Sequence, residues 1–105
     1  MAEIEFEPVN NIELCGRISS EPSERELPSG DVVLELRLVV PRTDRPGVDT
    51  LDLAFWKAAL RRKARKLVVG DVVRVSGALR RRFWQGKTRV VSRSQVEVAE
   101  LSKVN

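Results

Sequence analysis

Apolar and polar residues alternate along much of the chain, and this pattern predicts β-strands because successive side chains of a strand point to opposite faces. In residues 11–18, for example, Ile12, Leu14, Gly16 and Ile18 share one face. Residues 31–40 alternate over a longer stretch, with leucines on one face and charged residues among those on the other. The pattern predicts five strands, at residues 11–18, 31–40, 50–55, 72–84 and 87–98.

One segment departs from this alternation. Residues 57–67 contain six Lys or Arg residues, and Leu60, Ala64 and Leu67 recur at the spacing of one helix face. This spacing predicts a very basic helix of about three turns with a narrow apolar stripe. The stripe is the part of the helix that we expect to face a core.

Polar segments rich in proline separate these elements. Residues 19–30 and 41–49 are predicted as loops, and Gln85-Gly86 as a two-residue hairpin turn. The order is then three strands, one helix and two strands. This is the element order of the five-stranded OB-fold barrel, an all-β fold with one helix between strands 3 and 4.

The length of 105 residues suits one domain that spans residues 1–105. Within it, residues 1–10 are predicted as an acidic N-terminal extension and residues 102–105 as a frayed end. There is no apolar run of about 18 residues, so no membrane span is expected. The N-terminus lacks the features of a signal peptide.

The scarcity of cysteine and histidine limits the chemistry that the chain can perform. Cys15 is the one cysteine, and histidine is absent. An internal disulfide is therefore impossible, which fits a reducing cytosol. An ordinary zinc site and the commonest general base are also missing. We expect no enzyme activity, no metal and no small cofactor.

The positive charge of the chain is concentrated in one region. Thirteen of the nineteen Lys and Arg residues lie between Trp56 and Arg93, where Asp71 is the only acid. Residues 1–55 carry five basic and twelve acidic side chains. Trp56 and Trp84, the two tryptophans of the chain, fall inside the basic region. Cations interleaved with flat aromatic rings favour a single-stranded nucleic acid as the partner.

Several segments, in the correct order, resemble those of the bacterial single-stranded DNA-binding proteins. The resemblance runs from Asn11 to about Leu101. It is carried by NIELCGRI at residues 11–18, EP and LPSG at 21–22 and 27–30, LDLAFWK at 51–57, KLVVGDVVRVSGAL at 66–79, and RRFW at 81–84. Each segment alone is a weak signal, but five in order and spacing are specific.

The resemblance implies sequence-tolerant binding of single-stranded DNA in replication, recombination or repair, in the bacterial cytoplasm at the nucleoid. In that family, bases stack on aromatic rings that match Trp56 and Trp84 here. Two further aromatic positions fall near Asp44 and Thr50, which are not aromatic. The glycine-rich linker and acidic tip of the family are also absent. The resemblance further implies a homodimer or homotetramer that assembles partly through the first strand.

The predicted nucleic-acid-binding residues combine these two tryptophans with basic residues on strands or at the hairpin. Trp84 has an alternative role in packing against a partner subunit or a barrel end, and Trp56 one in the core or at the helix start. Phe83 is expected to point inward, and the basic helix face to be solvated. The predicted set is Trp84, Trp56, Arg80, Arg82, Lys87, Arg89, Arg37, Arg17 and Arg93.

Other functions remain open at this point. RNA is an alternative ligand, whereas neither a membrane nor a small-molecule substrate is expected. One alternative is a dimeric accessory protein that resembles the primosomal replication protein of the n type. Another is an interaction subunit that kept the barrel and lost DNA binding. A nuclease would need several carboxylates among the basic residues, and Asp71 is alone there.

Overall fold

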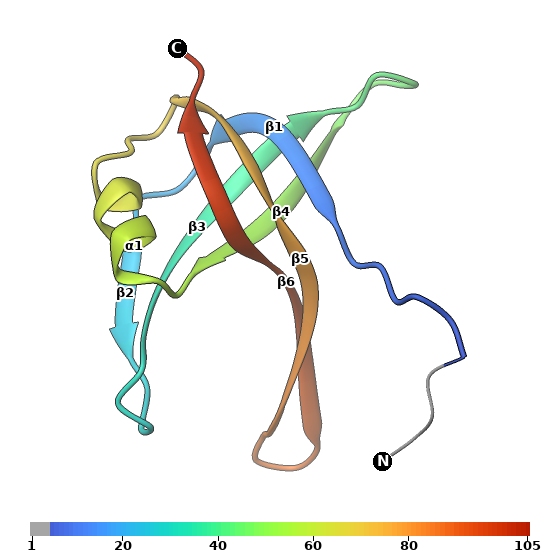
Figure 1. The fold of residues 1–105 in the computed structure, drawn as a ribbon, viewed down its shortest axis with the longest axis vertical. Helices are drawn as coiled ribbons and strands as arrows, with labels where there is room; N and C mark the ends of the chain where they lie inside the picture. Colours follow the sequence, from blue (N-terminus) through green and yellow to red (C-terminus); the bar gives the residue numbers. More distant parts are fainter. Residues whose placement is uncertain (1–4) are drawn as a thin grey trace.

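Five long strands curve into a closed barrel, and one helix lies against it (Figure 1). The structure is a computed structural model that describes residues 5–105. A sixth, short strand is added at the edge of the sheet. The elements are β1 Ile12–Ile18, β2 Ser23–Glu26, β3 Val32–Pro41, β4 Val48–Phe55, α1 Ala58–Arg65, β5 Val72–Gln85 and β6 Val90–Lys103.

The barrel closes because β1 pairs with two strands. Along the sheet the order is β1-β5-β6-β4-β3-β2, and β1 also pairs with β3 where Arg17 lies opposite Val39. All pairings are antiparallel except the short one between β4 and β6 at Leu53 and Val96. The five strands other than the edge strand β2 form the predicted OB-fold barrel. The helix lies between the third and the fourth of them, β4 and β5. The fold prediction is confirmed.

Most of the core comes from residues that alternation placed on the inner faces of the strands. Leu34, Leu36 and Leu38 of β3 are buried, and Phe55 at the end of β4 is fully buried. Burying a side chain of this kind contributes about 1.5–3 kcal/mol. The register of β5 with β6 shifts between Ser76 and Gly77, and a Cβ at Gly77 would collide with the backbone carbonyl of Glu97. A glycine is therefore required at this bulge.

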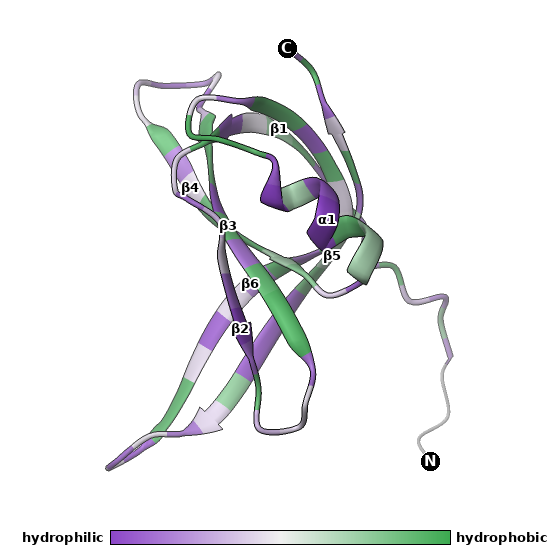
Figure 2. Cartoon of the chain, turned by 90° about the vertical axis from the view of Figure 1, so that its left-hand side faces the viewer, coloured by the Kyte–Doolittle hydropathy of each residue, from purple (hydrophilic) through white to green (hydrophobic). Residues whose placement is uncertain are grey.

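Helix α1 covers one opening of the barrel (Figure 2). The predicted stripe of Leu60, Ala64 and Leu67 is buried in the core. The predicted helix of residues 57–67 is longer than α1, which has eight residues. Within residues 5–105, no helix is long and apolar enough to cross a membrane.

The segment predicted as a loop at residues 19–30 contains β2, and this is a correction. β2 pairs with the first half of β3, with Ser23 opposite Glu35 and Glu26 opposite Val32. The strand has no apolar face, since all four of its residues are exposed. A pattern of apolar residues could not predict it, because it is held by backbone pairing and by charges.

The ends of the long strands also differ from the prediction. β3 reaches Pro41 and β4 begins at Val48, so the predicted loop at residues 41–49 shortens to residues 42–47. The predicted two-residue turn at Gln85-Gly86 is wrong, because Gln85 still pairs with Val90. The connection is residues 86–89, in which the Gly86 N–H donates to the carbonyl of Arg89.

The C-terminal end is not frayed as predicted, because β6 continues to Lys103. Leu101 is buried, and Ser102 and Lys103 pair with β5. At the other end, residues 5–10 of the predicted acidic extension form no strand. Asn10 nevertheless binds the barrel, because its side chain exchanges two hydrogen bonds with the backbone of Leu79. Residues 1–4 lie outside the described part of the chain.

Candidate nucleic-acid interface

The outer face of β3, β4, β5 and β6 brings most of the predicted binding residues together. Successive residues of a strand alternate between faces, so Arg80, Arg82 and Trp84 share the outer face of β5. Trp56 follows β4 directly, and its ring lies under the guanidinium of Arg82, with 5.1 Å between the guanidinium carbon and the ring centroid. Trp56 and Arg82 are far apart in the sequence, and the curvature of the barrel brings them into contact.

Trp84 lies farther out on a hairpin that β5 and β6 form below the barrel (Figure 1). Its side chain is 49% exposed, opposite Val91 of β6. Lys87 and Arg89 lie in the exposed connection at the hairpin tip. Within residues 5–105, the cation–π pairs are Arg82 with Trp56 and Arg81 with Phe83, and neither of them involves Trp84.

Three carboxylates, those of Asp52, Glu35 and Glu97, share this face with the predicted arginines. Asp52 of β4 lies between Arg37 of β3 and Arg93 of β6, at 3.6 and 3.1 Å respectively. Glu35 of β3 is 3.8 Å from Arg93. Its carboxylate also accepts a hydrogen bond from the side-chain amide of the buried Gln95. Arg37 and Arg93 are thus held in an ion-pair network rather than pointing freely into solvent.

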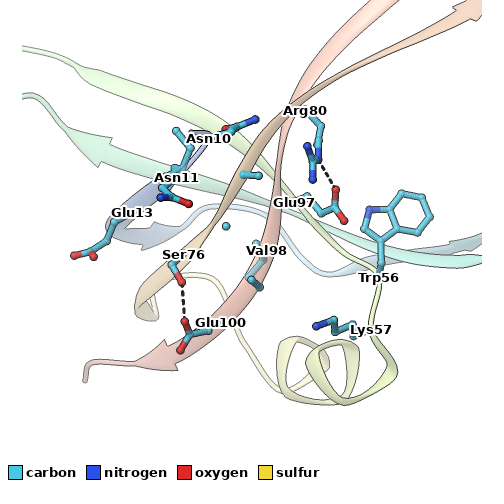
Figure 3. Close-up of a pocket in the computed structure, with 14 residues that line it drawn as sticks. Asn10, Asn11, Glu13, Trp56, Lys57, Ser76, Arg80, Glu97, Val98 and Glu100 are labelled. Atoms are coloured by element: carbon cyan, nitrogen blue, oxygen red, sulfur yellow. Dashed lines mark hydrogen bonds and ion pairs between the residues drawn. The ribbon is translucent and has the colours of Figure 1, made fainter. Parts of the chain in front are cut away.

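Arg80 is paired in the same way. Its guanidinium lies 2.9 Å from the carboxylate of Glu97, and Figure 3 shows both side chains beside Trp56. A hollow of about 520 Å³ opens here and continues toward Asn11 and Ser76. Because Glu97 lines it together with other acids, this hollow is less favourable for a phosphate than the arginine-rich surface around Arg82.

Arg17 is the predicted residue that the fold does not bring to this face. It lies on β1 where that strand pairs with both β3 and β5. Its guanidinium donates a hydrogen bond of 2.8 Å to the carbonyl of Gly70, in the turn before β5. Arg17 therefore supports this junction.

Phe83 does not point inward as predicted, and this is a correction. Its side chain is 63% exposed. Alternation does place Phe83 and Trp84 on opposite faces, but the hairpin has left the barrel at this point and neither face is covered. The prediction failed because it assumed a core behind every strand face.

Three of the helix cations also have partners within the chain. Arg61 donates to the backbone carbonyls of Val32 and Trp56, and Lys63 to that of Leu101. Arg65 forms two hydrogen bonds with the carboxylate of Glu24, at 2.6 and 2.7 Å. These bonds hold the pKa of Glu24 below its ordinary value, assisted by the charge of Arg61.

Sequence reasoning missed the carboxylates on the interface. A signal for Glu35 was present, because alternation places Glu35 and Arg37 on the same face of one strand. That Asp52 and Arg93 join them depends on the register between strands, which a single strand does not encode. Within residues 5–105, no three His, Cys, Asp or Glu residues are grouped in a way that suits a metal ion.

Comparison with known proteins agrees with this architecture. Among solved structures, the chain is similar to "Plasmodium falciparum SSB complex with ssDNA", with a TM-score of 0.79, 21% identity, and coverage of 97% of this chain and 100% of that one. At this identity the similarity shows the OB fold. A search of the curated proteins gives no match. The model of the single-strand binding protein family matches residues 9–103, and the chain therefore belongs to this family of DNA-binding proteins.

Proposed function

We propose that this chain binds single-stranded DNA, with little dependence on sequence, across the outer face of β3, β4, β5 and β6. The observation that carries the proposal is the group of Trp56, Arg82 and Trp84, which places two aromatic rings and a guanidinium on one continuous surface. Membership of the family supports the same ligand. The solved relative, by its title, is in complex with single-stranded DNA.

The two rings and the basic residues have different roles in this proposal. Bases stack on Trp84 and on the accessible part of Trp56, which tolerates any sequence because every base has a flat face. Arg82, Lys87 and Arg89 contact phosphates directly. Arg37, Arg80 and Arg93 reach phosphates by leaving the carboxylates of Asp52, Glu35 and Glu97.

A binding role without catalysis is part of the proposal. It is supported by the absence of histidine from the sequence and by the family, whose members are non-enzymatic DNA-binding proteins. A cytoplasmic location at the nucleoid follows as a proposal from the ligand and from the single free cysteine. RNA remains the alternative ligand, and competition between DNA and RNA oligonucleotides measures the preference.

We also propose that the chain forms a homodimer or a dimer of dimers. From Ile12 to Gly16, the edge of β1 that faces away from β5 has no ladder partner within residues 5–105. Such an edge is suited to pairing with a second copy. In antiparallel pairing of two β1 strands, Glu13 would meet Arg17 of the second copy, and it would first have to leave its ion pair of 2.9 Å with Arg74. Sedimentation equilibrium tests this, and a mass of 11.9 kDa contradicts it.

Replacing the tryptophans tests the proposed interface. Trp84→Ala and Trp56→Ala are each expected to weaken the binding of labelled oligo-dT by about 1–3 kcal/mol, the value of one base stacked on an aromatic ring. Fluorescence anisotropy measures the dissociation constants. Phe6→Ala is the control, since Phe6 is also an exposed aromatic residue but belongs to none of the strands of this face.

The possible results separate the candidate functions. If wild-type protein binds and both tryptophan variants bind equally well, the proposed face is wrong. If wild-type protein does not bind oligo-dT even at low salt, the alternative of an interaction subunit is favoured.

A further inference from the structure

The hairpin of β5 and β6 has a second exposed face, opposite Trp84. Leu79, Arg81 and Phe83 alternate along this face of β5. Phe83 is 63% exposed, and Leu79 and Val90 are exposed as well. Figure 2 shows the hairpin projecting away from the barrel, with hydrophilic and hydrophobic bands along it. No described part of the chain accounts for these exposed apolar residues.

Arg81 and Phe83 are arranged as an aromatic ring with an adjoining cation. The guanidinium carbon of Arg81 lies 5.1 Å from the centroid of the Phe83 ring. Two nitrogens of this guanidinium donate to the hydroxyl of Ser92, at 3.3 and 3.0 Å, and this holds it in place. Ser92 and Ser94 lie opposite Phe83 and Arg81 on β6, and these small residues leave the ring uncovered. Within residues 5–105, Arg81 has no carboxylate partner.

The positive charge of the hairpin favours a polyanion as its partner. From Val72 to Val96 the sequence has no acidic residue. A second copy of the chain would bring a like-charged hairpin to the same place, which is unfavourable. A polyanion with flat bases matches both features of this face, the cation and the ring. In the projecting part of the hairpin, residues 79–96, the basic residues are Arg80, Arg81, Arg82, Lys87, Arg89 and Arg93.

We infer that Phe83 and Arg81 form a second base-stacking site, so that single-stranded DNA contacts both faces of the β5–β6 hairpin. This inference rests on the proposed function. Phe83 and Trp84 are neighbours in sequence on opposite faces, so a strand that passes around the hairpin reaches both rings. A base stacks on Phe83 while Arg81 contacts the adjoining phosphate. Short DNA occupies the Trp84 face, and only longer DNA extends to the Phe83 face.

The test compares two lengths of oligo-dT, about 8 and about 30 nucleotides, because one OB fold covers about 4–16 nucleotides. Phe83→Leu keeps an apolar side chain and removes the ring. We expect it to weaken the binding of the long oligonucleotide about five- to a hundredfold, the effect of losing one stacked base, with little change for the short one. Phe6→Leu is the same substitution at another exposed phenylalanine and should change neither.

Arg81→Gln provides an independent measurement. For the long oligonucleotide, it should reduce the slope of log affinity against log salt by about 0.7, the contribution of one phosphate on single-stranded DNA. An unchanged slope together with unchanged affinity in Phe83→Leu overturns the inference. If Phe83→Leu instead alters the sedimentation mass and leaves DNA affinity unchanged, the face is a protein interface and the inference is also overturned.

Trp84→Ala distinguishes this inference from the proposed function. If Trp84→Ala weakens the binding of both lengths while Phe83→Leu weakens neither, the proposed interface is retained and the second site is rejected. If the wild-type protein binds neither length, the proposed function fails, and the second site fails with it.

Discussion

Asp52 shows how single residues set the strength of the interface. Its carboxylate lies within 3.6 Å of Arg37 and 3.1 Å of Arg93, on the face where phosphates are expected. A phosphate must therefore compete with Asp52 for these two guanidinium groups. Exposed ion pairs of this kind are each worth only ~0.2–1 kcal/mol, so such an exchange is feasible.

Asp52→Asn is accordingly expected to strengthen the binding of single-stranded DNA by about two- to tenfold, because it removes the ion pairs of Asp52 with Arg37 and Arg93. Arg93 then keeps only its longer contact with Glu35, at 3.8 Å. Because Arg37 and Arg93 contact phosphates in the wild-type complex as well, the slope of log affinity against log salt should change little. Titrations of labelled oligo-dT at several salt concentrations measure both quantities.

The matched control for this prediction is Asp31→Asn. It makes the same change of net charge, but at the turn before β3, where Asp31 interacts with Ser29. Equal strengthening by the two variants would mean that overall charge, rather than the release of Arg37 and Arg93, controls affinity.

Individual residues also show where reasoning from sequence succeeded and failed. Alternation predicted that Trp84 shares a face with Arg80 and Arg82, and the strand geometry agrees. The same alternation predicted an inward Phe83, which is wrong because β5 extends beyond the core at that point. A period of two assigns residues to two faces, but it does not indicate which face is covered.

Among the elements, β2 depends most on charge. It lies at the edge of the sheet and has no buried side chain. Its Glu24 accepts two hydrogen bonds from Arg65 of α1 and lies 3.7 Å from Arg61. Glu24 therefore ties the edge strand to the helix that covers the barrel. These contacts also hold the pKa of Glu24 below its ordinary value and raise that of Arg65.

The lowered pKa predicts a pH-dependent contribution to stability. Because the folded state favours the ionised carboxylate, Glu24 stabilises the fold above the ordinary pKa of a glutamate. This stabilisation is lost as pH falls through the lowered pKa. Glu24→Gln should reduce the melting temperature at neutral pH, and the difference from wild type should vanish in strong acid. Thermal unfolding followed by circular dichroism across this pH range measures it.

Glu26→Gln serves as the control for Glu24→Gln, because Glu26 lies on the same strand and forms no ion pair within residues 5–105. It should leave the melting temperature nearly unchanged. A difference between Glu24→Gln and wild type that stays constant from neutral to acid pH would show that the ion pair is not its cause.

At the scale of the whole molecule, the separation of charge along the chain becomes a separation in space. The basic region from Trp56 to Arg93 includes α1 and the β5–β6 hairpin. Three of its helix cations are bound within the chain, whereas Lys87 and Arg89 at the hairpin tip are exposed. The net charge of +4 therefore understates the field that DNA meets at the hairpin.

This distribution predicts a strong dependence of binding on salt. If about five phosphates are neutralised, log affinity for single-stranded DNA should fall with log salt at a slope of about −3 to −4, at ~0.7 per phosphate. Titrations of oligo-dT between low and physiological salt give the slope. A flat response would be incompatible with phosphate contacts along the hairpin.

The sequence by itself determined the barrel, its helix and the concentration of cations near two tryptophans. These features follow from local pattern, because apolar periodicity specifies which face of an element is buried and composition specifies charge. Only the tertiary structure placed Arg82 on Trp56, joined Asp52 to Arg37 and Arg93, and exposed Phe83. These contacts depend on strand register and on where the barrel ends, which arise from the packing of distant segments.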